Sequence, residues 1–286
     1  MTEPTASITV AVDPTNPGQF FACCGLLELA DRLWPGAEGW FAEEGRAFNI
    51  YGNGKNQDDL LILVDELLSC KVSTQLELDT VAALEDETTD TEEDTETEGG
   101  KKPKSDPVIL GSPLSFVLSW WLRQDGSDNL FKTWAANATS QQMFRKWVEP
   151  LRALRDEIVG LPSNLLGLPV KIQGSYGFDS LLGWDAFDIG FSLNEHNDLK
   201  KLPTRPAVEL LGAIGLQSFR PALNERERTV TYATWTARLL PNVARAVASG
   251  MIPDLASTVY RCQFVSRGTF KGLDFATPVG QGDTDE

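Results

Sequence analysis

The stretch ITVAVDPTNPGQFFACCGLLELA, residues 8–30, decides how the chain begins to fold. The alternating apolar run over residues 8–12 predicts a strand. Asn16 can cap a helix whose first position is Pro17, because the missing N–H of proline costs nothing there. A broad apolar helix face follows and ends at Trp34-Pro35. We therefore expect a strand, a capped turn and a well-buried helix.

The rest of the chain mixes strand and helix signals without a regular order, and no period of 20 to 50 residues indicates a repeat protein. The expected strands cover 47–51, 76–78, 114–122, 170–172, 186–193, 229–240 and 258–264. The expected helices cover 58–68, 128–155 (as one or two helices), 208–219 and 243–248. This pattern predicts an α+β fold with a mixed, mainly antiparallel sheet, packed helices and an acidic disordered insertion.

The chain has 286 residues, 42% of them hydrophobic, which is enough for one large domain or two ordinary ones with a real core. Residues 85–98 hold nine carboxylates and no aromatic residue, so they cannot bury apolar surface. We expect an N-terminal α/β part over 1–82, a disordered acidic linker over 83–106, a C-terminal α+β part with a basic segment over 107–276, and a flexible tail over 277–286.

The net charge of −16 argues at first against a polyanionic partner. The charge is unevenly distributed, because residues 1–98 carry a net −18 while residues 199–271 hold 11 basic and 4 acidic residues, a local +7. The acidic character therefore belongs to one half of the chain, and the basic segment is compatible with a nucleic-acid partner.

Cysteine and histidine usage excludes several classes of site. The four cysteines form no C-x-x-C pair, and Cys23 and Cys24 lie in an apolar segment where buried thiols are expected. A multi-histidine metal site cannot be built from the single His196. We expect neither a metal nor a cofactor.

No apolar run approaches the roughly 20 residues that a membrane span needs. The first residues also lack the charged and apolar regions of a secretory signal. A soluble, cytoplasmic protein without membrane contact is therefore expected.

One candidate function is that of a metal-dependent nuclease. Asp179, Asp185 and Asp188 cluster in the sequence, and such carboxylates can hold Mg²⁺ for phosphodiester cleavage. Aspartate is also common in loops, and no Glu-x-Lys or histidine partner stands nearby.

The basic segment carries the main candidate site, because arginine can pair with phosphate bidentately and aromatic rings can stack on bases. The candidate nucleic-acid-binding residues are Lys200, Lys201, Arg205, Arg220, Arg226, Arg228, Arg238, Arg245, Arg261, Arg267 and Lys271. The interleaved aromatic residues are Tyr232, Trp235, Tyr260, Phe264 and Phe270. Two interpretations stay open: nucleic-acid contact, or a core Trp235 beneath a solvated charged face.

Residues 12–30, VDPTNPGQFFACCGLLELA, resemble the N-terminal signature of CRISPR-associated proteins from the type I-U (I-G) systems. Three further stretches are similar to later parts of the same family: 188–193, 210–221 and 232–235. The family resembled is one of small proteins that are either accessory or similar to the large subunit of such systems. The likeness covers most of the chain apart from the acidic insertion.

The resemblance implies a non-catalytic subunit or accessory of an RNA-guided surveillance complex in antiviral defence. Its partners would be other effector subunits and, where it contacts nucleic acid, guide RNA or target DNA, with sequence selection left to base pairing. The family offers no established catalytic residues. A protein–protein adaptor that never touches nucleic acid is the other open alternative, with the acidic half docking on basic partners.

Overall fold

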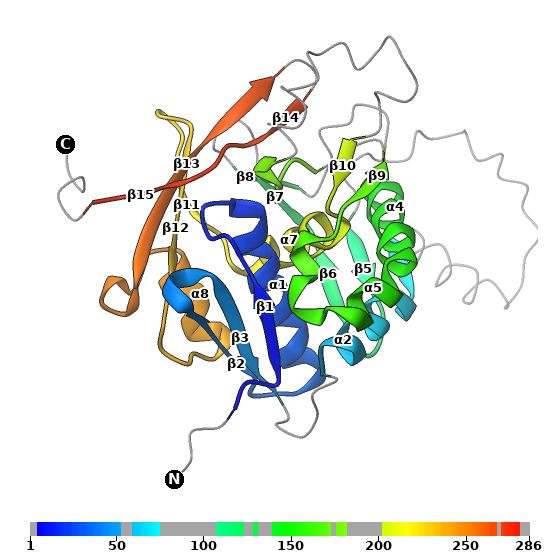
Figure 1. The fold of residues 1–286 in the computed structure, drawn as a ribbon. Coiled ribbons are helices and arrows are strands. Elements are labelled where there is room, and N and C mark those ends of the chain that lie inside the picture. Colours follow the sequence, from blue (N-terminus) through cyan, green and yellow to red (C-terminus); the bar gives the residue numbers. More distant parts are fainter. Residues whose placement is uncertain are drawn as a thin grey trace, which may run out of the picture.

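The structure is a computed structural model that describes residues 5–52, 59–74, 107–122, 128–130, 139–172, 176–181, 202–267 and 270–280 (Figure 1). Its helices are α1 (Pro17–Leu33), α2 (Asp59–Ser69), α4 (Ser140–Ala153), α5 (Arg155–Gly160), α7 (Pro206–Ser218) and α8 (Pro241–Ala248), with the short 3-10 helices η1 (Glu43–Gly45), η2 (Pro162–Gly167) and η3 (Pro253–Leu255).

The strands form several small sheets, and every strand pair within the described ranges is antiparallel. The N-terminal sheet has the order β1–β3–β2, from β1 (Ile8–Ala11), β2 (Glu38–Ala42) and β3 (Ala47–Tyr51). The C-terminal sheet has the order β11–β12–β13–β14, with β15 also on β13, from β11 (Ala222–Asn224), β12 (Thr229–Thr234), β13 (Thr258–Arg267), β14 (Phe270–Leu273) and β15 (Thr277–Pro278). The remaining sheets are β4–β5–β6, from β4 (Val72–Thr74), β5 (Val108–Leu110) and β6 (Phe116–Leu118), and the pairs β7 (Trp120–Leu122) with β8 (Asp128–Leu130) and β9 (Val170–Ile172) with β10 (Leu202–Thr204). Helices and antiparallel sheets together confirm the α+β class.

Helices α1 and α7 run through the centre of the fold, with the C-terminal sheet on one side and β5, β6 and α4 on the other (Figure 1). Their backbones touch. A methyl group added at Gly25 would lie 2.1 Å from the Leu211 carbonyl oxygen, and one at Gly215 would lie 2.0 Å from the Phe21 carbonyl oxygen. Only glycine permits this approach at both positions.

The core joins the two parts expected from the sequence, because a single apolar cluster includes residues from Ile8 to Ala276. Phe20 of α1 stacks on Tyr232 of β12 with ring centroids 4.3 Å apart. Phe41 of β2 meets Trp235 edge-on at 5.1 Å. Helix α1 thus packs against the N-terminal and C-terminal sheets at once, and its aromatic contacts hold the sheets to one core.

The start of the fold agrees with the sequence analysis. The side chain of Asn16 accepts a hydrogen bond from Gly18 N at 3.0 Å, Pro17 is the first residue of α1, and the helix ends at Leu33 before Trp34. The strand, capped turn and buried helix expected over residues 8–34 are confirmed.

The single strand expected over 114–122 is wrong, because β6 and β7 belong to different sheets. Between them, the backbone N–H groups of Ser119 and Trp120 both donate to Oε1 of Gln217, each at 2.9 Å. Gln217 Nε2 donates in turn to the Trp120 carbonyl oxygen at 3.1 Å. A side chain of α7 therefore takes the place of a neighbouring strand at the break.

The strand expected over 229–240 is too long, because β12 ends at Thr234. Trp235 is fully buried, and its indole N–H donates to the Gly39 carbonyl oxygen at 2.8 Å. The chain beyond it pairs with β2 instead, through hydrogen bonds between Gly39 and Leu239.

The other differences concern residues 128–155 and the segments near them. Residues 128–130 form β8 rather than the start of a helix, and α4 begins at Ser140 after a capping box made by Thr139 and Gln142. The strands expected over 76–78 and 186–193, and the acidic insertion over 83–106, lie outside the described residues.

The contact between α1 and α7 makes a direct prediction. Replacing Gly25 or Gly215 with Ala should lower the free energy of unfolding by about 3 kcal/mol or more, because the new methyl group must push two backbones apart. The measurement is urea unfolding followed by circular dichroism. Gly160→Ala is the matched control: a methyl group there meets nothing within 4 Å, so stability should change by less than about 1 kcal/mol. Equal effects at Gly25 and Gly160 would show that the helices do not approach as described.

Candidate functional site

The turn between β1 and α1 is held by its own side chains. Oδ1 of Asp13 accepts hydrogen bonds from Thr15 N at 2.9 Å and Thr15 Oγ1 at 2.6 Å. Oε1 of Gln19 accepts from Asp13 N at 2.8 Å, and the Thr15 carbonyl oxygen accepts from Ala276 N at 2.7 Å. These bonds fix the turn from both the helix side and the C-terminal side.

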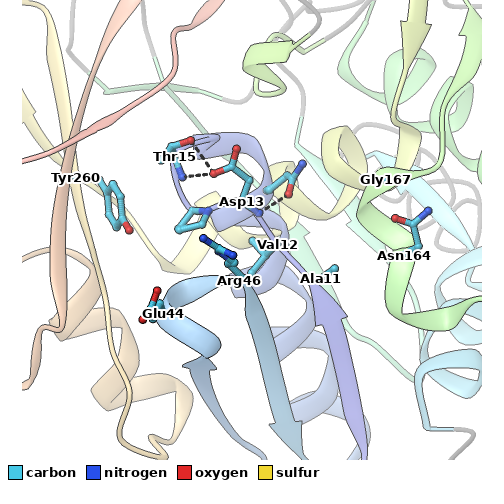
Figure 2. Close-up of a pocket in the computed structure, with 11 residues that line it drawn as sticks. Ala11, Val12, Asp13, Thr15, Glu44, Arg46, Asn164, Gly167 and Tyr260 are labelled. Atoms are coloured by element: carbon cyan, nitrogen blue, oxygen red, sulfur yellow. Dashed lines mark hydrogen bonds between the residues drawn. The ribbon is translucent and has the colours of Figure 1, made fainter.

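A pocket of about 520 Å³ opens beside this turn (Figure 2). We call it the turn pocket. It is bounded by the β1–α1 turn, by η1 and the following Arg46, by η2 and by β13. Its polar lining residues include Asp13, Thr15, Glu44, Arg46, Asn164 and Tyr260. The motif that carries the family resemblance thus forms one wall.

The wall made by η1 has an unusual backbone. Glu43, Glu44 and Gly45 follow one another with φ angles of 51°, 57° and 89°, all in the left-handed region. Each non-glycine residue there costs about 1–2 kcal/mol, and such strain gathers at functional sites. The conformation turns β2 into β3 and presents Arg46, whose carbonyl oxygen accepts from Val12 N at 2.9 Å. The Arg46 side chain itself is exposed.

Tyr260 closes the pocket on the side of the C-terminal sheet. Its ring stacks on Tyr232 with centroids 5.6 Å apart, and Tyr232 donates its hydroxyl to the Pro14 carbonyl oxygen at 2.7 Å. The hydroxyl end of Tyr260 points toward the η1 wall (Figure 2). Burial raises the pKa of Tyr260, so its hydroxyl stays protonated and can donate a hydrogen bond at neutral pH.

A buried polar network lies under the turn. Nδ2 of Asn16 donates to Oδ1 of Asp179 at 2.8 Å, and the Arg205 guanidinium donates to Oδ2 of Asp179 at 2.9 Å. Glu209 of α7 accepts from the backbone N–H groups of Tyr176 at 2.6 Å and Asp179 at 3.2 Å. Asn16, Asp179 and Glu209 are almost fully buried. Arg205 and Asp179 are therefore engaged in joining the turn to α7.

Arg238 is also engaged within the fold. It forms an ion pair with Glu38 of β2, and its guanidinium lies 5.4 Å from the ring centre of Trp40 and 4.7 Å from that of Tyr51. These contacts attach the segment after β12 to the N-terminal sheet. A role in nucleic-acid binding would have to compete with them.

Arg245 and Arg220 make similar contacts. Arg245 pairs with the buried Glu28 and lies 5.8 Å from the Phe219 ring centre, while the exposed Arg220 lies 5.0 Å over the ring of Trp120. Arg245 neutralises a carboxylate inside the core. Arg220 keeps an accessible guanidinium face.

Five of the other predicted basic residues belong to the C-terminal sheet and its turns. Arg226 and Arg228 are exposed in the turn between β11 and β12, and Arg261 is half-buried on β13. Arg267 ends β13 and Lys271 lies on β14, which together form the neighbouring hairpin. Lys200 and Lys201 lie outside the described residues.

The aromatic residues between these cations do not form a surface for stacking. Tyr232, Trp235, Tyr260 and Phe264 are each less than 10% exposed. The interpretation of Trp235 as a core residue is confirmed. The side chain of Phe270 lies outside the described residues.

The remaining predictions concern a metal site, the cysteines and a membrane span. Asp185, Asp188 and His196 lie outside the described residues. Among the residues that are described, no group of three His, Cys, Asp or Glu side chains is arranged to hold a metal ion. Cys23 and Cys24 are buried free thiols, and burial raises the pKa of both. No helix in the described ranges is both long and apolar enough to span a membrane.

Comparison of the chain with protein-family models, with curated proteins and with solved structures gave no match.

The turn pocket was missed by sequence reasoning, although the turn itself was found. Asp13 belongs to the quoted motif, but Arg46, Asn164 and Tyr260 come from three separate places in the chain. The available signal was the glycine at position 45 between the charged residues Glu44 and Arg46, just before the strand expected over 47–51, which indicates a turn but no cavity.

The buried network predicts a large effect at Asp179. Asp179→Ala should lower the free energy of unfolding by about 3–5 kcal/mol, because it leaves the Arg205 charge and the Asn16 amide without their acceptor. Asp65→Ala is the control, since it removes a bidentate pair with Arg155 in which both side chains are 46% exposed. That change should cost less than about 1 kcal/mol. Similar losses in urea unfolding of the two variants would contradict the structural role of the network.

Proposed function

We propose that the protein is a non-catalytic subunit or accessory of a type I CRISPR RNA-guided surveillance complex in antiviral defence. In this proposal it contacts the sugar–phosphate backbone of guide RNA or target DNA, next to other effector subunits. The sequence motif supports the class of complex. The exposed turn that carries Arg226 and Arg228, beside the end of β13 on the C-terminal sheet, supports the nucleic-acid contact and is the observation that carries it.

We call this end of the sheet the basic hairpin end and define it by Arg226 and Arg228 of that turn, Arg267 as the last residue of β13 and Lys271 on β14. Thr229, the first residue of β12, pairs with Gln263, and Phe264 N donates to the Arg228 carbonyl oxygen at 3.3 Å. From Phe264, β13 runs three residues further, about 10 Å, to Arg267. The β11–β12 turn and the end of β13 therefore lie at the same end of the sheet (Figure 1).

Contact at this end would position nucleic acid rather than read its sequence. Arginine side chains on exposed turns can reach phosphate oxygens and donate two parallel hydrogen bonds. Glu225 and Glu227 alternate with Arg226 and Arg228, so the turn lacks the strong positive field of a nonspecific DNA-binding surface. Modest affinity with a clear dependence on salt is expected.

The adaptor alternative has its own supporting observation. Arg205, Arg238 and Arg245 pair with carboxylates of the same chain, which reduces the number of cations that can meet a phosphate. An adaptor would keep its fold and its protein contacts when the basic hairpin end is reversed in charge. The following experiment separates the two functions.

The double variant Arg226→Glu/Arg228→Glu should weaken binding of single-stranded RNA at least about tenfold, because both exposed guanidinium groups become repulsive to phosphate. The slope of log affinity against log salt should fall by about 1–2. Fluorescence anisotropy with a labelled oligonucleotide at several salt concentrations measures both quantities.

The control Lys71→Glu/Lys171→Glu makes the same change in net charge at two exposed lysines outside the C-terminal sheet, next to β4 and on β9. It should reduce affinity much less. Equal weakening by both double variants would indicate a nonspecific charge effect and remove the basic hairpin end as the site. Absence of binding to the unaltered protein and to its purified complex would favour the adaptor.

A further inference from the structure

The turn pocket has the size and the walls of a small-molecule site. Its volume of about 520 Å³ lies within the roughly 300–1,000 Å³ of ligand pockets and would hold a nucleoside. Ala11, Val12, Pro14 and Gly167 give it apolar walls. The rigid turn and the strained η1 segment hold these walls without a ligand.

The pocket contains both a hydrogen-bond acceptor and hydrogen-bond donors that the described residues leave available. Oδ1 of Asp13 receives both bonds from Thr15, while no hydrogen bond reaches Oδ2 from any described residue. The Arg46 guanidinium likewise has no ion pair in the described part of the chain, although Asp13 and Glu44 line the same cavity. The pocket therefore offers a free carboxylate oxygen and free guanidinium N–H groups to a ligand.

The charged residues of the pocket favour a neutral ligand that has hydrogen-bond donors and an acceptor along one edge. A phosphate group would meet the carboxylates of Asp13 and Glu44, and a lysine or arginine side chain would meet the Arg46 cation. A planar heterocycle that carries N–H donors beside a carbonyl acceptor meets neither conflict. The edges of unpaired nucleobases have this pattern, and proteins read single-stranded bases in pockets of this kind.

The pocket is also within reach of the basic hairpin end. Tyr260 lies four residues before Phe264 on β13, about 13 Å along the strand from the level of Arg228. A strand held by its phosphates at the hairpins could place one unstacked base beside Tyr260. The two sites would then act on one nucleic-acid strand.

We propose that the turn pocket receives one unpaired nucleobase, with Oδ2 of Asp13 accepting its N–H groups and Arg46 donating to its carbonyl oxygen. Guanine matches this arrangement best, because its edge places O6 beside two N–H donors. The Tyr260 hydroxyl and the Asn164 amide supply further hydrogen bonds at the rim. This inference rests on the proposed function.

The test uses guanosine, adenosine, cytidine and uridine as probes, titrated into the full chain and followed by ligand-observed NMR. Guanosine should bind most tightly. Asp13→Asn should weaken its binding about tenfold, since the amide keeps an oxygen for Thr15 but replaces the free acceptor with a donor. Arg46→Met should do the same while keeping the apolar stem.

Two comparisons separate this inference from the proposed function. The variant Arg226→Glu/Arg228→Glu should leave guanosine binding unchanged while it weakens RNA binding. Unchanged thermal unfolding of Asp13→Asn and Arg46→Met shows that the pocket variants are folded.

RNA binding with no nucleoside binding, or with nucleoside binding that neither pocket variant alters, overturns the inference and leaves the proposed function standing. Binding of a neutral blocked dipeptide that depends on Asp13 and Arg46, without nucleoside binding, identifies a peptide pocket and also overturns it. If the unaltered protein binds neither RNA nor any nucleoside, both proposals are rejected together.

Discussion

The backbone contact between α1 and α7 is the constraint on which the rest of the structure depends. Gly25 and Gly215 let the two helices approach until a single methyl group would collide with a carbonyl oxygen. Because α1 also meets the N-terminal sheet and the C-terminal sheet, the distance between the helices sets where each sheet lies. One close contact thereby fixes the relative positions of elements that are distant in the sequence.

The turn that leads into α1 serves both the fold and the site. On its buried side, Asn16 and Asp179 tie it to Arg205 and so to the start of α7. On its open side, Asp13 lines the turn pocket together with Arg46. The buried network makes the turn rigid, and a rigid turn keeps the free oxygen of Asp13 in one place, as a preorganised site requires.

The sequence predicted the elements that depend on local signals. The capped start of α1 followed from Asn16 and Pro17, and the helix α7 followed from apolar periodicity. Elements set by tertiary contacts were not predictable in this way: Gln217 breaks the strand expected over 114–122, and Trp235 ends β12 by turning into the core. The same limit applies to the site, since periodicity does not show which arginines a buried carboxylate has already engaged.

The most direct measurement is ultraviolet crosslinking of the natural complex, followed by mass spectrometry of peptides that carry a nucleotide. The proposed nucleic-acid contact predicts crosslinked nucleotides on peptides that span 222–238 and 258–273, with a second group on the β1–α1 turn. A complex that contains nucleic acid but crosslinks to this chain only through protein, or only at α2, α4 and α5, would contradict it.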